Sequence, residues 1–589
     1  ERKNFMYTWN LDRLYQGLDD PKWTQNLQIA DELIAKQRIL MQQATTMVPH
    51  TFLKESLLLE ESLDTVFSTL FQFVSLSLAT DVANVEYNNA LLLLRKKAIL
   101  TTLPRTQFEK YIGSLTNLEA IIDQDPYLQA YRFILLETQQ HATHLMSNEE
   151  EVLASELGQS GGSLYSKMQG DLTSTLEVTY RNTIITLSKV RNLAYDRDSA
   201  VRKDAYYAEL AGYEKIAKPM SYALHGIKKE VLTLSKKRQF ASPLEETLHK
   251  SRLTSKALDA LLQAIQQSLP HFRRYMKRKG EFLGHKDGLP FYDLFAPMGS
   301  MDKEYSIEDA QAFILKHFAS FSSDLHDMAK RAFNESWVDY LPKDGKRGGA
   351  FCSSIYPLHE SRILTNYGNT MGDISTLAHE LGHAYHNLHI GKERILNTSY
   401  PMPIAETASI LCETIVKKAA IKEATTTEER LGMLEQELQD ATQVIVDIYS
   451  RYLFESVVFS RSDNEFLNEA TLDNIMSKAQ LDSYGDGLCS STLHPRMWIN
   501  KGHYYSTGRS FYNFPYAFGL LFAKGIYAKY QEKGPKFVAS IQNLLRHTGK
   551  QTLVDVAKSI DIDIEKVDYW QQALSVIQED IDEFLLLTK

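Results

Sequence analysis

The stretch TLAHELGHAYHNLHIG (residues 376–391) carries four histidines and a glutamate within eleven positions. At about 100° of rotation per residue, His379 and His383 lie about 40° apart on a helix, so both imidazoles project from one face. That arrangement lets two side chains bind a single zinc ion. Glu380 lies beside them, where it can reach a metal-bound water. The alternative is a solvated helix with scattered histidines, because an isolated HExxH pattern also occurs by chance.

The residues around this motif favour a buried metal site over a solvated helix. We expect a helix over 374–390, with Asp373 or Ser375 as its N-terminal cap and Gly391 at its end. Small and apolar residues occupy the other faces of LAHELGHA, which indicates burial. Two buried imidazoles and a carboxylate need polar partners, and a metal ion with its water satisfies all three.

A third ligand is expected in SYPMPIAETASILCET (399–414). The prolines of this segment end a loop, and a new helix is predicted to begin near Ile404. Glu406 then lies in the first turn of that helix, among small residues that let two helices pack closely. The alternative is that Glu406 only stabilises the helix N-terminus electrostatically. Glu413 returns to the same face seven residues later, and we expect it to hydrogen-bond a ligand imidazole.

His389 competes with Glu406 as the third ligand, since it has the spacing of the last histidine in HExxHxxGxxH. The glycine of that pattern is replaced here by His386, and a continuing helix turns His389 about 120° away from His383. We therefore predict Glu406 as the ligand. His386 lies about one turn beyond His383 and is predicted to be an outer partner of the site or part of a solvated helix end.

Composition narrows the class of protein. The chain has 589 residues, a net charge of −9, 43% hydrophobic residues and 24% charged residues, which is typical of globular proteins. A mildly acidic chain gives no reason to expect nucleic acid or a membrane as partner. Its three cysteines, Cys352, Cys412 and Cys489, are too few and too scattered for a disulfide framework and favour a reducing compartment. The start lacks the apolar run of a secretory signal, so we expect a cytoplasmic location.

The fold class follows from the spacing of apolar residues. They recur at helical spacing over 25–46, 53–80, 83–100, 128–146, 174–195, 199–212, 218–238, 255–280, 307–333, 427–461 and 515–532. The most apolar stretch, 66–79, is short and interrupted by polar residues, and we interpret it as a buried helix. We predict a mainly α protein with an N-terminal helical region (1–115), a helical linker (116–200) and a catalytic domain (201–589). Breaks are expected at 147–163 and 341–349.

Two strand-like segments precede the histidine helix. GAFCSSIY (349–356) and SRILTNY (361–367) are predicted to form a β-hairpin. An exposed strand edge can bind an extended peptide through its backbone, whereas the alternative is a small stabilising ribbon. We predict that the edge binds substrate at Gly348, Gly349, Ala350 and Phe351.

Taken together, these segments resemble peptidase family M3, the thimet-type oligopeptidases, and in particular its oligoendopeptidase F branch. LAHELGHAYH and the later IAETAS carry most of the resemblance, and YDLFAPM (292–298), GKRGGAFC (345–352) and HYYSTGRSFYNFPYAFG (503–519) add to it. The resemblance implies a two-lobed helical fold with a deep substrate channel and zinc on its floor. It also implies His379, His383 and Glu406 as zinc ligands and Glu380 as the general base.

The resemblance further implies that His503 and nearby tyrosines bind the reacting carbonyl. A tyrosine hydroxyl or an imidazole N–H supplies the hydrogen-bond donor that this chemistry requires. The candidates are His503, Tyr512, Tyr505 and Tyr516. The alternative is an aromatic core patch, because the chain contains 31 tyrosines. The spacing between His503 and the tyrosines differs from that of the thimet-type enzymes.

The predicted function is a zinc-dependent endopeptidase with one Zn²⁺, which hydrolyses internal bonds of short oligopeptides through a zinc-bound water activated by Glu380. Short peptides are the expected partners. A zinc carboxypeptidase or other exopeptidase of related fold is one alternative, and a catalytically idle helical peptide-binding protein is another. A cysteine peptidase using Cys352 is a third, weaker alternative.

Overall fold

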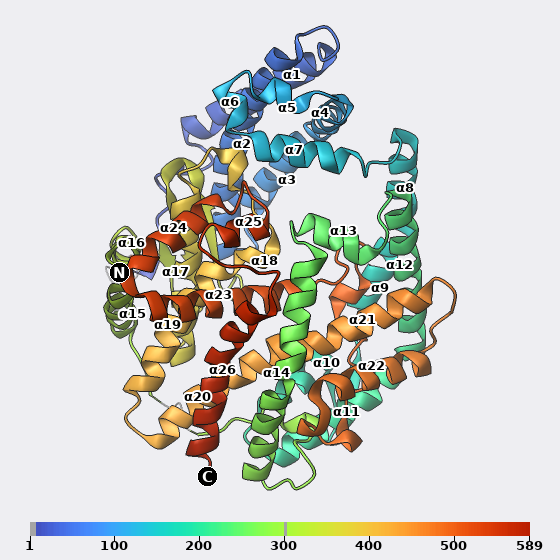
Figure 1. Ribbon diagram of the computed structural model, residues 1–589, viewed down its shortest axis with the longest axis vertical. Coiled ribbons are helices and arrows are strands. Elements are labelled where there is room, and N and C mark those ends of the chain that lie inside the picture. Colours follow the sequence, from blue (N-terminus) through green and yellow to red (C-terminus); the bar gives the residue numbers. More distant parts are fainter. Residues whose placement is uncertain (1–6, 300–302) are drawn as a thin grey trace.

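The computed structural model describes residues 7–299 and 303–589, and Figure 1 shows the chain. Helices form most of the described chain, so the predicted mainly α fold class is confirmed. Residues 1–6 of the expected N-terminal region lie outside the described residues, as do residues 300–302.

The N-terminal helices gather at one end of the molecule, in blue in Figure 1. They pack in two hydrophobic clusters, one around Trp23 and Phe73 and the other around Leu57 and Tyr131. They are α1 (Pro21–Gln42), α2 (Pro49–Thr80), α3 (Val85–Ile99), α4 (Thr102–Ser114), α5 (Leu118–Ile122), α6 (Pro126–Gln129) and α7 (Arg132–Ala142).

The middle of the chain is helical except for one β-hairpin. Its elements are α8 (Asn148–Ser160), α9 (Gly162–Ser174), β1 (Glu177–Tyr180), β2 (Thr183–Thr186), α10 (Leu187–Asn192), α11 (Ser199–Glu214), α12 (Ala217–Lys237), α13 (Pro243–Lys250), α14 (Ser255–Phe282), α15 (Ile307–Phe321) and α16 (Ser323–Asn334). The expected helix over 174–195 is wrong, because Arg181 and Asn182 both adopt positive φ and close a two-residue hairpin turn. The break expected over 147–163 is confined to the region around Gly161.

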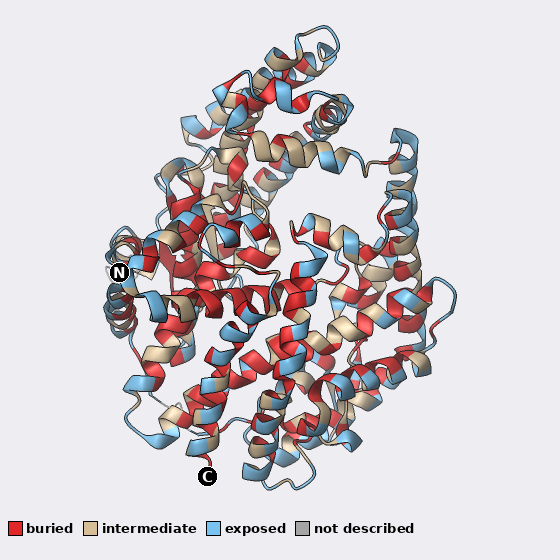
Figure 2. Ribbon diagram, in the orientation of Figure 1, coloured by how far each residue is buried: buried red, intermediate tan, exposed pale blue. Residues whose placement is uncertain are grey.

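The remaining elements follow, and Figure 2 shows buried residues concentrated along α17 and α23 near the centre of the molecule. They are β3 (Val338–Asp339), β4 (Phe351–Ile355), β5 (Glu360–Leu364), α17 (Met371–Ile390), α18 (Met402–Ala405), α19 (Thr407–Glu423), α20 (Thr427–Thr442), α21 (Ile448–Ser462), α22 (Glu469–Tyr484), α23 (Phe514–Lys533), α24 (Val538–His547), α25 (Leu553–Lys558) and α26 (Val567–Leu587).

The predicted hairpin before the histidine helix is confirmed, with β4 and β5 antiparallel. A short strand that the sequence did not reveal, β3, pairs in parallel with β5. The order β3-β5-β4 leaves β4 at the edge of this sheet. Ile355 and Leu364 pack into the N-terminal cluster around Trp23, whereas Ile363 packs into the large cluster that fills the rest of the molecule. The sheet therefore joins these two hydrophobic clusters.

The division into 1–115, 116–200 and 201–589 stays a prediction, and the buried clusters divide the chain differently. Leu118 and Tyr131 of the expected linker pack with α2. Leu176 and Val190 of the same region pack in the large cluster. Among the described residues, the two halves of 116–200 thus belong to different cores.

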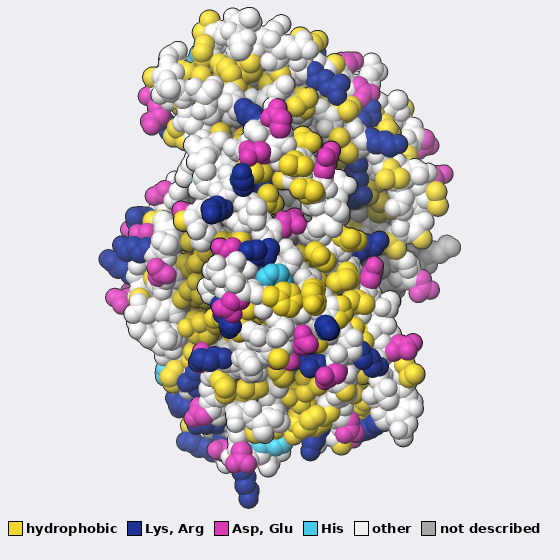
Figure 3. Space-filling model, turned by 90° about the vertical axis from the view of Figure 1, so that its right-hand side faces the viewer, with side chains coloured by type: hydrophobic (Ala, Val, Ile, Leu, Met, Phe, Trp, Pro, Cys, Tyr) yellow, Lys and Arg dark blue, Asp and Glu magenta, His cyan; other side chains and the backbone are white. Residues whose placement is uncertain are grey.

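Two surface features bear on partners. By length and composition alone α2 is apolar enough to cross a membrane, with 39% of its most apolar window buried inside the structure. Core helices of globular proteins have the same properties, so this is weak evidence. Figure 3 shows basic and acidic side chains interspersed over one face of the molecule, without a continuous field of either sign.

Helices α17 and α19 pack closely where α17 carries Gly382. A Cβ atom on Gly382 would lie 2.5 Å from the carbonyl oxygen of Ala408 and 2.5 Å from the Cα of Ser409. Both are backbone atoms, which cannot rotate away as a side chain can. Only glycine fits here, and it lies between His379 and His383 in the sequence.

Replacing this glycine tests the contact. We expect Gly382→Ala to force α19 away from α17 and to lower the free energy of unfolding by about 1–3 kcal/mol, measured by denaturant titration. Gly372→Ala in the first turn of α17 is the control, because its Cβ would meet nothing nearer than Thr370 Oγ1 at 3.5 Å. Wild-type stability in Gly382→Ala would contradict this account.

Candidate metal centre

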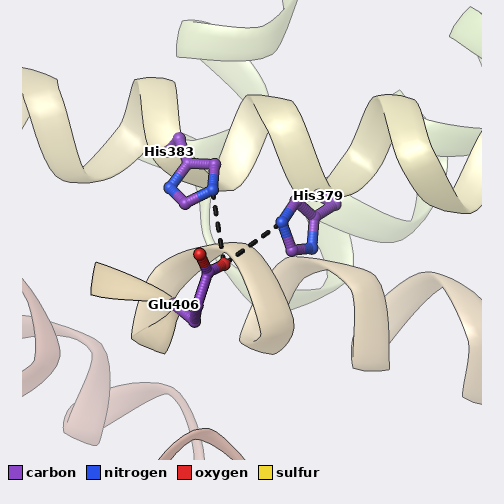
Figure 4. A group of neighbouring side chains, drawn as sticks. All are labelled: His379, His383 and Glu406. Carbon is purple, nitrogen blue, oxygen red and sulfur yellow. Dashed lines mark ion pairs between the residues drawn. The ribbon is translucent and has the colours of Figure 1, made fainter. Parts of the chain in front are cut away.

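Two imidazoles from α17 and one carboxylate from the start of α19 converge on a single point. The Nε2 atoms of His379 and His383 lie 3.2 Å and 3.4 Å from Oε2 of Glu406. One ligand atom from each residue falls within 4.8 Å of the other two, which suits one metal ion. Figure 4 shows both rings projecting from one helix toward the carboxylate on the next. The structure thus brings together the three residues that the sequence predicted as ligands.

Local structure explains how α17 aims the two histidines. The helix begins at Met371, three residues before the expected start, because Thr370 and Asp373 form a reciprocal capping box. Asp373 thus supports the cap without being the cap residue that we expected. Gly391 follows the last helical residue, as predicted.

Glu406 lies at a break between two helices. The short α18 ends at Ala405 and α19 begins at Thr407, so Glu406 occupies the junction with φ of −90° and ψ of 5°. Its carboxylate makes no cap hydrogen bond and instead accepts one from Ser409 Oγ at 2.8 Å. On its other side, α23 approaches so closely that a Cβ on Gly519 would lie 3.1 Å from Cβ of Glu406. Packing from both sides therefore orients this carboxylate.

Glu413 contacts a predicted ligand, as the sequence suggested. Its Oε2 lies 2.9 Å from Nδ1 of His379, which leaves Nε2 of that ring for a metal. Burial alone would lower the pKa of His379, but hydrogen bonds to Glu406 and Glu413 raise it to about 10. A metal ion competes with a proton for this ring. Burial would raise the pKa of Glu413, but the charge of Lys417 and the bond to His379 lower it to about 2.

Glu380 is buried beside the ligands and has an unused oxygen. Glu380 is 6% exposed, and its Oε2 atom has no hydrogen-bond partner among the described residues. Burial raises the pKa of this carboxyl above its usual value. An ionised carboxylate with a raised pKa and a free oxygen is suited to accept a proton from water.

The other two histidines of residues 376–391, His386 and His389, contact residues outside the candidate centre. His386 is fully buried, so a solvated helix end is wrong; its Nε2 lies 2.8 Å from Thr548 Oγ1 and its ring stacks on Tyr400. Burial lowers the pKa of His386 to about 3. His389 Nε2 lies 3.1 Å from Asp324 Oδ2, away from the ligand group, as the helical rotation predicted.

Of the four candidate carbonyl-binding residues, Tyr516 lies beside the ligand group and Tyr512 contacts Tyr516. Tyr516, in the first turn of α23, lines the same cavity as His379 and Glu406. Its hydroxyl donates a hydrogen bond to Tyr512 at 2.9 Å, which leaves the Tyr512 proton available to another acceptor. The ring of Tyr512 stacks near His503 at 6.0 Å between centroids. The predicted helix start at Asn513–Pro515 is confirmed, with Asn513 preceding α23.

His503 and Tyr505 are placed less favourably. His503 Nε2 accepts from Asn513 Nδ2 at 2.6 Å, and burial, with the charge of Arg451, lowers the pKa of His503 to about 2. The ring is therefore neutral, with its proton on Nδ1. The prediction that Tyr505 binds the reacting carbonyl is wrong, because Tyr505 is 0% exposed and its hydroxyl is enclosed in the large hydrophobic cluster. No substrate can contact Tyr505 in this arrangement.

The predicted substrate-binding segment lies at the start of the edge strand. Gly348 and Gly349 are exposed and precede β4, and the Gly349 carbonyl accepts from Asn366 Nδ2 at 2.8 Å. Ala350 and Phe351 are half-buried, and Phe351 is the first residue of β4. The neighbouring Cys352 is no activated nucleophile, since burial raises the pKa of its thiol far above the usual value.

Two cavities are relevant, one beside the candidate centre and one near the edge strand. One of about 480 Å³ is lined by His379, Glu406, Glu413 and Tyr516, together with Lys417 and Lys524. The other, of about 750 Å³, lies between α2, the end of β4, the end of α17 and the 395–400 segment. Its wall includes Gln72 of α2, Ser354 of β4 and Asn387 of α17, so it follows the strand edge. These volumes are those of small-molecule and peptide sites.

Lys417 was missed by the sequence reasoning, although its signal is present. It lies four residues after Glu413 on α19, and its Nζ is 2.7 Å from Oε1 of that carboxylate. Its other partners, Glu437 and Asp440, come from α20, and no spacing in the sequence predicts that α20 lies beside Lys417.

Comparison with known proteins agrees with this geometry. The family model described as "Peptidase family M3" matches residues 192–576, and one described as "Oligopeptidase F" matches residues 114–177. "Oligopeptidase PepF" of Bacillus subtilis is 22% identical, over 98% of this chain and 86% of the relative. "Group B oligopeptidase PepB" of Streptococcus agalactiae is 24% identical, over 79% of this chain and 78% of the relative.

Solved structures show the same fold. A putative peptidase from Chlamydophila abortus superposes with a TM-score of 0.85 at 22% identity, covering 99% of this chain and 98% of the other. Oligoendopeptidase-F from Enterococcus faecium gives 0.68 at 18% identity, covering 95% and 99%.

The choice between two third ligands can be measured. We expect Glu406→Gln to lose most of its bound zinc on dialysis, because a neutral amide is a weaker ligand than a carboxylate. His389→Ala should retain zinc, since His389 contacts Asp324 instead. Metal content per chain after dialysis decides between them, and zinc loss confined to His389→Ala would reverse the assignment.

Proposed function

The chain belongs to peptidase family M3 and is a metalloendopeptidase, and on that premise we propose that it hydrolyses internal bonds of short oligopeptides with one zinc ion. The convergence of His379, His383 and Glu406 carries the proposal. Two neutral imidazole nitrogens and one carboxylate oxygen are the donor set of catalytic zinc sites, which keep another position open for the reaction.

The surroundings fit a metal ion at this point. His379 is held by Glu413 through its other nitrogen, the usual support for a metal-binding imidazole. Glu380 keeps an unpartnered oxygen in a buried position, where a water molecule would satisfy it. When bound, zinc supplies a Lewis acid that polarises a carbonyl and lowers the pKa of water.

Glu380 moves the proton in this proposal. Its carboxylate accepts a proton from the water that attacks the peptide carbonyl, and it returns that proton to the departing amine. Burial raises the pKa of the Glu380 carboxyl toward neutral pH, which suits a group that must both accept and release a proton.

Tyr512 is the proposed donor to the carbonyl oxygen as negative charge develops on it, and Tyr516 is its supporting partner. Tyr516 donates to Tyr512 and so polarises the free O–H of Tyr512, which strengthens that hydroxyl as a donor. His503 packs on the Tyr512 ring and is assigned to hold it in place.

The peptide is proposed to lie along the free edge of β4, from the segment Gly348–Phe351 toward Ser354. Backbone hydrogen bonds at a strand edge bind extended chains with little regard to side chains. The cavity of about 750 Å³ beyond Ser354 would receive the adjoining residues. The walls that α2 and α17 give this cavity support binding of a short peptide.

We also propose a cytoplasmic location, with neither nucleic acid nor membrane as partner. The three cysteines are unpaired, as a reducing compartment requires, and charges of both signs are interspersed over the face in Figure 3.

An internally quenched peptide tests the function. We expect cleavage by the zinc-loaded protein, loss of cleavage after chelation, and recovery on adding zinc. Mass analysis of the products should show internal cuts. A ladder of single-residue products would instead indicate an exopeptidase, and cleavage that survives complete metal removal would contradict the zinc proposal.

Glu380→Gln separates catalysis from metal binding. The variant should keep its zinc content and its thermal unfolding temperature, because Glu380 is not a ligand. Its kcat should fall by about 10²–10⁴-fold, the usual contribution of a general base. Wild-type turnover in Glu380→Gln would remove this residue from the mechanism.

Tyr512→Phe tests the carbonyl donor. We expect kcat to fall by about 10²–10³-fold, as for loss of one oxyanion donor, with little change in KM. Tyr505→Phe is the matched control from the same segment and should keep wild-type kcat, because that hydroxyl is enclosed in the core. Equal losses in both variants would show a structural effect.

A further inference from the structure

A chain of alternating charges extends from His379 into the protein. Glu413 bonds Nδ1 of His379, and Lys417 Nζ lies 2.7 Å from the other oxygen of Glu413. Lys417 also lies 2.9 Å from Oε2 of Glu437, whose Oε1 is 2.6 Å from Lys524 Nζ. We call Glu413, Lys417, Glu437 and Lys524 the Glu–Lys chain.

The Glu–Lys chain is largely withdrawn from water. The side chain of Lys524 is 2% exposed, that of Glu437 is 9% and that of Lys417 is 17%. Burying such charges is costly, and a buried ion pair commonly adds no net stability over an apolar packing of the same volume. Asp440, which is 52% exposed, approaches Lys417 at 3.3 Å from the solvent side. Helix packing alone gives no reason to keep these charges.

Three helices meet in this chain. Glu413 and Lys417 come from α19, Glu437 comes from α20 and Lys524 comes from α23. The single carboxylate of Glu437 therefore bonds one lysine from each of the other two helices. Replacing this carboxylate would break both ion pairs and leave α19 and α23 held by direct packing alone.

Both helices that Glu437 connects carry parts of the candidate centre. Helix α19 follows Glu406 and supports His379 through Glu413. Helix α23 carries Tyr516, eight residues before Lys524, and at helical spacing both side chains line one face. They do line the same cavity of about 480 Å³, together with His379 and Glu406.

We propose that Glu437 is a positioning residue, which holds the metal-binding side of α19 and the tyrosine-bearing side of α23 at a fixed separation. Through Lys417 it orients Glu413 and thus His379, and through Lys524 it orients α23 and thus Tyr516. This inference rests on the proposed function, since it assigns a purpose to the separation of a zinc ligand and Tyr516, the partner of the proposed carbonyl donor Tyr512.

Glu437→Gln tests the metal arm. We expect zinc affinity, titrated into metal-free protein against a chromophoric chelator, to weaken about 10–100-fold, the usual cost of disturbing an outer partner of a ligand. After saturation with zinc, kcat should remain below wild type with KM nearly unchanged.

Lys524→Met separates the two arms. It leaves Glu437 paired with Lys417 and breaks only the bond to α23. We expect wild-type zinc affinity and a lowered kcat. This variant also tests the inference if Glu437→Gln does not fold.

Glu435→Gln is the matched control. Glu435 lies two residues before Glu437 on α20 and pairs with Lys279 of α14 from a side chain that is 3% exposed. A general loss of packing should lower the unfolding temperature of both variants, whereas zinc affinity and kcat should fall only in Glu437→Gln. The inference would be overturned if zinc affinity and kcat fell equally in Glu437→Gln and in the control. It would also be overturned if Glu437→Gln and Lys524→Met each kept wild-type zinc affinity and kcat. A wild-type protein that binds zinc and cleaves peptides separates that result from failure of the proposed function.

Discussion

The candidate centre depends on how closely two helix backbones approach at Gly382. The two candidate ligand imidazoles flank this glycine on α17, and the backbone of Ala408 and Ser409 on α19 lies where a Cβ would otherwise be. Glu406 precedes these residues by only a few positions, so the approach delivers its carboxylate to the two rings. A larger residue at 382 would keep the helical pattern of the motif intact while separating its ligands. The HExxH spacing is therefore necessary for this site, and the close crossing completes it.

Charge imposes a second constraint on the same region. His379 lies between Glu406 and Glu413, and beyond them Lys417 lies between Glu413 and Glu437. Buried carboxylates are tolerated only with compensating partners, and each here has a cation or an imidazole in contact. Glu380 is the exception, since one of its buried oxygens has no partner among the described residues. An unpaired polar atom beside an otherwise compensated array is where chemistry with water is expected.

The sequence was sufficient where the interactions are local. Helical rotation alone placed His379 and His383 together and turned His389 away, and the loop prolines and small residues identified Glu406. It failed where a partner comes from afar. Thr548, which binds His386, is 162 residues away, and the sequence spacing also gave no means to recognise that Tyr505 is enclosed. The β1–β2 hairpin was missed because a short alternating segment was taken for helical periodicity.

The three-stranded sheet links the proposed substrate-binding strand to the N-terminal helices. Phe351 and Ile355 of β4 pack into the N-terminal cluster, and Ser353 Oγ donates to Gln72 of α2 at 2.6 Å. On the other face, Asn387 of α17 donates to Ser361 Oγ of β5 at 3.1 Å. The free edge of β4 is thus held between α2 and the helix that carries the histidines. A shift of α2 would move one wall of the neighbouring cavity and the strand together, so the N-terminal helices are part of the proposed peptide site rather than a separate cover.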